Sequence, residues 1–193
     1  MGKLLVIADE GDSCIATSRG LQLARKLGHS VEVVAFVYAP LSRIARGKEK
    51  QASFKQALLE RRREQVQARI DRFSEKGQRV SLRVVWMEHI HPWVNKRAAK
   101  AGFDAVVKTG NQSGNLIYTS TDWHLLRECP APVLITAEKR WHRTKPVLAA
   151  LDLGTRNSQK RALNSKILAQ AKALAETLGV ELRIISAIEI PAI

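Results

Sequence analysis

A strand, a helix and a second strand follow one another in residues 3–40, which read KLLVIADEGDSCIATSRGLQLARKLGHSVEVVAFVYAP. Residues 3–8 form the continuous apolar run that is typical of a strand covered by helices on both faces. Residues 13–27 carry apolar side chains at helical spacing, and Gly28 stands where a helix stop is expected. Residues 31–38 are rich in β-branched and aromatic residues, so the stretch predicts a βαβ unit with two parallel strands.

The alternation of strands and helices continues beyond this unit. A long charged helix with an apolar stripe is predicted to end near Gly77, and a loop is expected before it, over residues 41–50. The later elements are expected as strands at residues 80–86, 104–108 and 133–136 and helices at residues 91–101 and 120–128. We therefore predict an α/β fold with a doubly wound, parallel, five-stranded sheet.

The opening pattern returns after a short basic segment. The aligned stretches are residues 4–9 with 147–152, 24–28 with 175–179, and 31–40 with 182–191. Matching Asp, Gly and Pro in the same order predicts a tandem duplication. We expect a complete domain over residues 1–138, a basic linker over residues 139–145, and a partial second copy (β-α-β) over residues 146–193.

A partial copy with two parallel strands and one helix leaves an unpaired sheet edge and apolar faces. We expect residues 146–193 to pack on the first domain, to pair with a second copy in a homodimer, or to belong to a truncated product.

Composition narrows the class of protein. The chain has 193 residues, of which 45% are hydrophobic, and this suits a globular protein. Its apolar runs fall well short of the roughly 20 residues that span a bilayer, and the short run near the N-terminus is followed by acidic residues, unlike a signal peptide. We expect a cytoplasmic protein without membrane insertion, in which Cys14 and Cys129 stay reduced.

The most specific stretch is STDWHLLRECPAPVLI, residues 120–135. Together with the strand that ends in Asp9 and the helix end at residues 24–28, it resembles the universal stress protein family, especially its tandem, E-type members. The resemblance implies a sheet in the order 3-2-1-4-5 with two helices on each face, a fold similar to the adenine nucleotide α-hydrolase-like superfamily. Ligands of such sheets bind where the strand order reverses, which places Asp9 and the Gly110 loop across one crevice.

The family's ATP-binding members use that crevice, and they are similar in carrying Gly-x-x-Gly followed by a Gly-Ser or Gly-Thr pair, whose backbone N–H groups hold phosphates. By this resemblance Thr119 replaces the last glycine, and only four residues separate it from Gly114. We expect a degenerate nucleotide-binding loop and no cofactor, with ATP binding as the alternative. The positions expected to contact a nucleotide or small anion are Asp9, Val37, Gly110, Gly114 and Ser120.

Two constellations suggest catalysis or metal binding. Ser120, Asp122 and His124 contain the residue types of a hydrolase triad, but on a helix Asp122 points away from the face that the other two share. His89 and His91 could bind zinc with a third ligand, but no Cys-x-x-Cys or His-Glu-x-x-His pattern accompanies them. We predict no catalytic residues and no metal, with a polar loop around the two histidines.

The formal net charge is +14, and such a field attracts polyanions. Residues 50–76 form a basic helix whose densest point is the arginine run at 61–63, which we interpret as a solvated face. The aromatic residues that stack on single-stranded bases are nearly absent there. The favoured hypothesis is a non-enzymatic regulatory or binding protein of the stress response. The alternatives are an ATP-binding or nucleotide-processing member of this superfamily and a nucleic-acid-associated protein.

Overall fold

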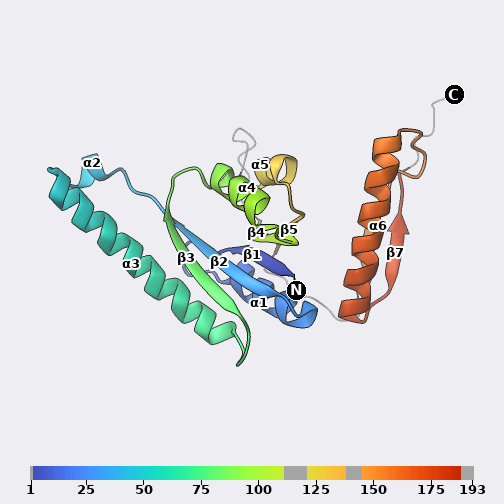
Figure 1. The fold of residues 1–193 in the computed structure, drawn as a ribbon, viewed down its shortest axis with the longest axis horizontal. Helices are drawn as coiled ribbons and strands as arrows, with labels where there is room; N and C mark the ends of the chain where they lie inside the picture. The colour runs from blue at the N-terminus through green and yellow to red at the C-terminus, as the bar shows by residue number, and fades with distance from the viewer. Residues whose placement is uncertain (1, 111–120, 138–144, 188–193) are drawn as a thin grey trace. The chain divides into compact units, whose positions relative to one another are not determined.

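The computed structural model describes residues 2–110, 121–137 and 145–187 (Figure 1). The chain divides into two compact units, residues 1–138 and residues 139–193. Each unit is described by itself.

The first unit is built on a five-stranded sheet whose order is β3-β2-β1-β4-β5 and whose neighbouring strands are all parallel. The strands are β1 (Lys3–Ile7), β2 (Ser30–Val37), β3 (Val80–Trp86), β4 (Ala105–Thr109) and β5 (Val133–Thr136). The order reverses between β1 and β4, and this confirms the predicted doubly wound sheet.

Helices cover both faces of this sheet (Figure 1). They are α1 (Ile15–Leu27), α3 (Lys48–Phe73), α4 (Ile90–Ala101) and α5 (Thr121–Glu128), while the short helix α2 (Leu41–Ile44) packs beside α3. On one face, Leu5 and Ile7 pack with Val94 of α4 and Leu125 of α5 in a buried cluster. Val6 points to the opposite face, because side chains alternate along a strand, and lies against α1. Helix α3 packs beside α1 on that second face.

Several element boundaries differ from the sequence prediction, for example at the end of β1, which lies at Ile7 rather than residue 8, and at the start of α1, which lies at Ile15 rather than residue 13. The basic helix spans Lys48–Phe73 rather than residues 50–76, because Ser74 adopts an extended backbone conformation that ends it. The short helix α2 lies within the stretch that was expected to be a loop. Strand β4 spans Ala105–Thr109, one residue later than predicted, because it pairs with β5 through Thr109.

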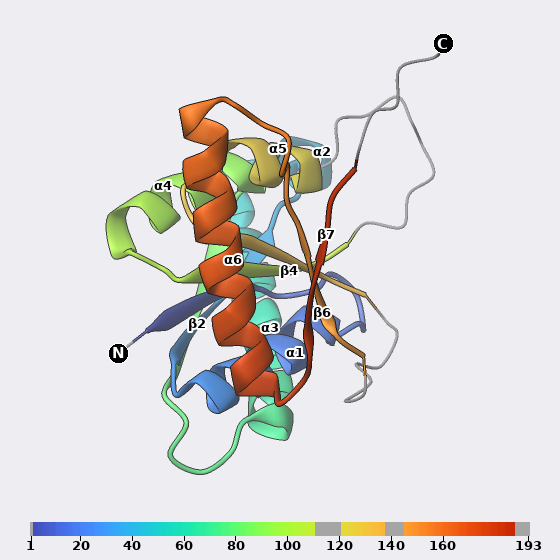
Figure 2. The same cartoon turned by 90° about the vertical axis from the view of Figure 1, so that its right-hand side faces the viewer.

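The second unit contains two parallel strands, β6 (Val147–Ala150) and β7 (Leu182–Ile185), joined by α6 (Ser158–Leu178). Figure 2 shows α6 beside both strands. The Asn157 side chain accepts hydrogen bonds from the first backbone N–H groups of α6, and Gly179 ends the helix in the left-handed conformation. This is a βαβ unit; that it repeats the first domain stays a prediction.

No helix in the part of the chain that the structure describes combines the length and the apolar character needed to cross a lipid bilayer.

Candidate functional site

A cavity of about 300 Å³ lies at the carboxyl ends of β1 and β4, where the strand order reverses. Its described lining comprises Ile7, Ala8, Asp9, Glu10, Ser13, Phe36, Ile90, Lys108, Thr109, Gly110 and Thr121. The lining therefore combines an apolar wall with carboxylate, ammonium and hydroxyl groups. Small-molecule sites of doubly wound sheets occupy this place.

Asp9 lies just beyond the end of β1, after Ala8, and its side chain is buried near the start of α1. Its Oδ2 atom accepts a hydrogen bond from the backbone N–H of Ala16 at 3.0 Å. The hydroxyl of Thr109 donates to Oδ1 of Asp9 and accepts from the same N–H at 3.0 Å. Cys14 occupies the N-cap position of α1 without a side-chain cap. Asp9 therefore caps the N-terminus of α1 although it lies outside the helix. Through its hydrogen bond with Thr109 it also links α1 to the end of β4.

Lys108 brings a positive charge to the same cavity from β4. Its Nζ atom lies 2.8 Å from Oδ1 of Asp122 in the first turn of α5 and donates to the carbonyl of Thr109 at 2.8 Å. The side chains of Lys108 and Asp122 are 10% and 15% exposed. This ion pair joins strand to helix at the cavity wall.

Gly110 lies where the edge of the cavity meets β5. Its N–H donates to the carbonyl of Thr136 at 2.9 Å, and a Cβ atom at this position would lie 3.0 Å from Cγ2 of Ile135. The absence of a side chain therefore permits close packing of Gly110 on β5. Close packing gives Gly110 a structural reason to be glycine, independent of any ligand.

Of the remaining candidate residues, Val37 lies within the described part of the chain. Val37, at the end of β2, lines a second hollow of about 440 Å³. This hollow shares Glu10, Phe36 and Ile90 with the first cavity. Gly114 and Ser120 lie outside the described residues, as does the loop that the sequence predicts to be degenerate.

Sequence reasoning missed the role of two arginines of α3. Arg62 is buried, and its Nη2 atom donates to the carbonyl of Asp9 at 2.6 Å. Arg69 donates to the carbonyls of Asp9 and Ser13 at 3.3 and 2.9 Å and also to that of Gly11. These bonds fix the loop that leads from β1 to α1.

The interpretation of the basic run as a solvated face is therefore wrong for Arg62. Burial, together with the positive charge of Arg69, lowers the pKa of Arg62, while the nearby carboxylates of Glu10 and Asp9 raise it. A signal was present in the sequence, because Arg62 precedes Val66 and Ile70 at intervals of four residues and so shares their buried helix face.

Asp122 and His124, which belong to the rejected triad, have different partners. Asp122 pairs with Lys108, whereas Nδ1 of His124 lies 3.2 Å from Oε1 of Glu128. Asp122 and His124 therefore each pair with a different charged group.

The fold and the cavity at the strand-order reversal define a doubly wound α/β protein of the kind that binds ligands at its switch point. The model of the universal stress protein family matches residues 1–137, and the chain belongs to this family.

Curated relatives agree with this assignment. Universal stress protein E of Salmonella typhi is 25% identical over 183 residues, which cover 91% of this chain and 58% of that protein. A universal stress protein E homolog of Haemophilus influenzae is 26% identical over 134 residues, covering 68% of this chain and 43% of the homolog. The match thus spans little more than half the length of the first relative.

Solved structures share the fold. A functionally unknown protein from Pseudomonas aeruginosa PAO1 superposes with a TM-score of 0.66 at 23% identity, covering 95% of this chain and 60% of that chain. The universal stress protein UspA from Lactobacillus plantarum gives a TM-score of 0.53 at 14% identity, covering 69% and 96% of the two chains.

Proposed function

We propose that this chain is a non-enzymatic regulatory protein of the stress response that binds a small anionic or nucleotide ligand in the cavity beside Asp9 and Gly110. The observation that carries the proposal is the position of the cavity at the reversal of strand order. Lys108 and Ser13 line it with donors that suit an anionic group. The cytoplasm as the location and a homodimer as the assembly belong to the same proposal.

Binding without turnover is supported by the bonds of the polar groups in the cavity. The carboxylate of Asp9 is engaged by Ala16 and Thr109, and Lys108 is paired with Asp122. The described residues that line the cavity include no histidine or cysteine. Groups held in this way favour positioning of a ligand over proton transfer to it.

The nucleic-acid alternative receives less support from α3. Arg62 and Arg69 direct their guanidinium groups to backbone carbonyls of the loop between β1 and α1, so they are withdrawn from the basic face.

A larger side chain at the edge of the cavity tests whether the ligand binds there. Ser13 lines the cavity and its hydroxyl has no hydrogen-bond partner among the described residues, so Ser13→Leu obstructs the space without breaking a described bond. Ser53→Leu, on the exposed surface of α3, is the matched control. Mass spectrometry of small molecules released from each purified protein is expected to find a ligand with the native chain and the control and to lose it with Ser13→Leu.

ATP turnover assays complete the test. We expect no multiple-turnover hydrolysis of ATP by the native chain. Sustained hydrolysis that Ser13→Leu abolishes would replace the proposal with a nucleotide-processing enzyme. Release of the same ligand from both variants would place its binding site elsewhere.

A further inference from the structure

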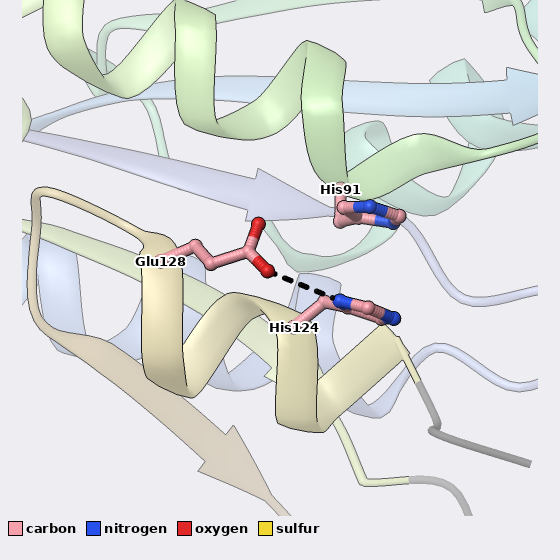
Figure 3. A group of neighbouring side chains, drawn as sticks. All are labelled: His91, His124 and Glu128. Carbon is pink, nitrogen blue, oxygen red and sulfur yellow. Dashed lines mark hydrogen bonds and ion pairs between the residues drawn. The ribbon is translucent and has the colours of Figure 1, made fainter.

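A second group of polar side chains gathers outside the cavity, between α4 and α5. It comprises His91 in the first turn of α4 and His124 and Glu128, one turn apart on α5 (Figure 3). One ligand atom from each side chain can be chosen so that all three lie within 4.8 Å of one another. The two imidazole rings stack with their centroids 4.2 Å apart.

We propose that His91, His124 and Glu128 form a binding site for a divalent transition-metal ion, with zinc as the ion that best suits this donor set. The proposal is independent of the proposed ligand cavity. Two imidazole nitrogens and one carboxylate oxygen make a common three-residue zinc set, in which water takes the fourth position. Glu128 is exposed and both histidines are partly exposed, so an ion can enter from solvent.

The backbones that carry the three ligands are held firmly. Val94 and Ala98 of α4 and Leu125 of α5 are buried in one apolar cluster, which fixes the two helices against each other. Only side-chain torsions have to change to bring the ligand atoms to the roughly 2 Å metal distances of zinc. One imidazole must also turn out of the stack so that its lone pair points at the ion, and the χ2 torsion that allows this is soft.

A neighbouring side chain supports the carboxylate. Nδ2 of Asn95, one turn after His91 on α4, donates to Oε2 of Glu128 at 3.4 Å. The other carboxylate oxygen, Oε1, lies 3.2 Å from Nδ1 of His124. A hydrogen bond from a residue that does not itself bind the metal, such as Asn95, orients a metal-binding carboxylate.

The surroundings of His91 lower its pKa. Burial lowers the pKa of His91, the nearby His124 and His89 lower it further, and Glu128 opposes them. Neutral imidazole is the form that binds metals, so affinity is expected to fall as acid protonates the histidines.

The sequence prediction of no metal site rested on His89 and His91 alone. The structure adds His124 and Glu128, which lie more than 30 residues further along the chain and reach His91 only because α4 and α5 pack together. No local spacing motif records such a pairing.

Titration calorimetry of the full chain, free of any affinity tag, with Zn²⁺ tests the site. We expect one ion per chain, with His91→Ala and His124→Ala each losing at least about tenfold in affinity. Glu128→Gln is expected to weaken binding as well. Since Glu128 is exposed, this variant keeps the test valid if a histidine variant fails to fold.

His29→Ala is the matched control, because Nε2 of His29 lies 3.4 Å from a carboxylate oxygen of Asp104, a His–carboxylate pair on another part of the unit. We expect this variant to bind Zn²⁺ like the native chain. The proposal is overturned if Zn²⁺ shows no saturable binding up to millimolar concentration. It is equally overturned if His91→Ala and His124→Ala bind as tightly as the native chain, or if His29→Ala weakens binding as much as they do.

Discussion

Glu32 is a buried carboxylate near the start of β2, with its charge compensated by three neighbours. Lys3 of β1 lies 2.8 Å from it, Arg97 of α4 contacts both carboxylate oxygens at 2.8 and 2.6 Å, and Arg83 of β3 lies at 3.4 Å. Burial alone raises the pKa of Glu32, but the hydrogen bonds and charges of Arg97 and Lys3 outweigh it and bring the pKa down to about 2.

The lowered pKa of Glu32 predicts a pH-dependent contribution to stability. A carboxyl group whose folded-state pKa lies below its unfolded value stabilises the fold above the unfolded pKa, and this stabilisation is lost as pH falls toward the folded value. Glu32→Gln is expected to lower the free energy of unfolding by about 2–3 kcal/mol at pH 7, as measured by urea denaturation. The difference from the native chain should shrink as the pH is lowered from 4.5 toward 2.

Glu181→Gln provides the control for this prediction. Glu181 pairs with Arg183 at 2.9 Å, but both side chains are exposed to solvent. Water screens such a pair, so the substitution is expected to leave the unfolding free energy unchanged. Equal effects of the two substitutions would contradict the assignment of Glu32 as a buried, stabilising charge.

Substitution of Asp9 is expected to destabilise the fold. Its carboxylate accepts a hydrogen bond from the backbone N–H of Ala16 and links α1 to Thr109. Asp9→Ala is expected to cost about 1–2 kcal/mol in unfolding free energy, the range for loss of a helix cap. Asp9→Asn should cost less, because its amide oxygen still accepts from Ala16. Asp12→Ala, exposed in the same loop, is the control. Unchanged stability of Asp9→Ala in thermal and urea unfolding would refute the capping role.

Helix α3 stabilises the loop between β1 and α1 through Arg69, which donates hydrogen bonds to three carbonyls of that loop. Arg69→Met removes these bonds, so the amides of residues 10–14 are expected to exchange hydrogen faster and the unfolding free energy to fall by about 1–2 kcal/mol. Arg63→Met, on the exposed side of the same helix, should leave both quantities as they are. Hydrogen-exchange mass spectrometry distinguishes the two variants, and an unaltered loop in Arg69→Met would show that α3 does not stabilise it.

At the same scale, the elements of the first unit were largely predictable because their signals are local. The apolar run of β1, the Gly28 stop of α1 and the β-branched residues of β2 each lie within a few positions of the structure they specify. The contacts between elements carry no such signal. Arg62 reaches Asp9 across 53 positions, and its spacing to Val66 and Ile70 indicates the buried face of α3 without indicating Asp9 as its partner.

The candidate site was predictable to the same extent. The position of Asp9 and Gly110 at the ends of β1 and β4 follows from the strand order, which the sequence pattern and the family resemblance both imply. Lys108 was not identified beforehand, because a lysine inside a short strand has no recognisable spacing to its partner on the next helix. Side-chain pairing across elements depends on helix rotation, which periodicity alone fixes only coarsely.

The two units of the whole molecule differ in how much core they contain. The buried hydrophobic residues of the first unit include large side chains of β1, β2 and β4, such as Leu5, Val34 and Val107. Among the described residues of the second unit, the buried hydrophobic ones are Ala149, Leu151 and Ala175.

This contrast predicts that the two units differ in independent stability. A fragment of residues 1–137 is expected to unfold cooperatively, because its sheet is covered on both faces by its own helices. A fragment of residues 145–193 should lack a cooperative transition, since two strands and one helix bury little and leave Leu148, Ile184 and Ile185 at least half exposed. Thermal unfolding followed by circular dichroism compares the fragments with the full chain. A sigmoidal transition of the shorter fragment at low concentration would show that its small core suffices, whereas a transition that appears only on concentration would show that its apolar faces are covered by self-association.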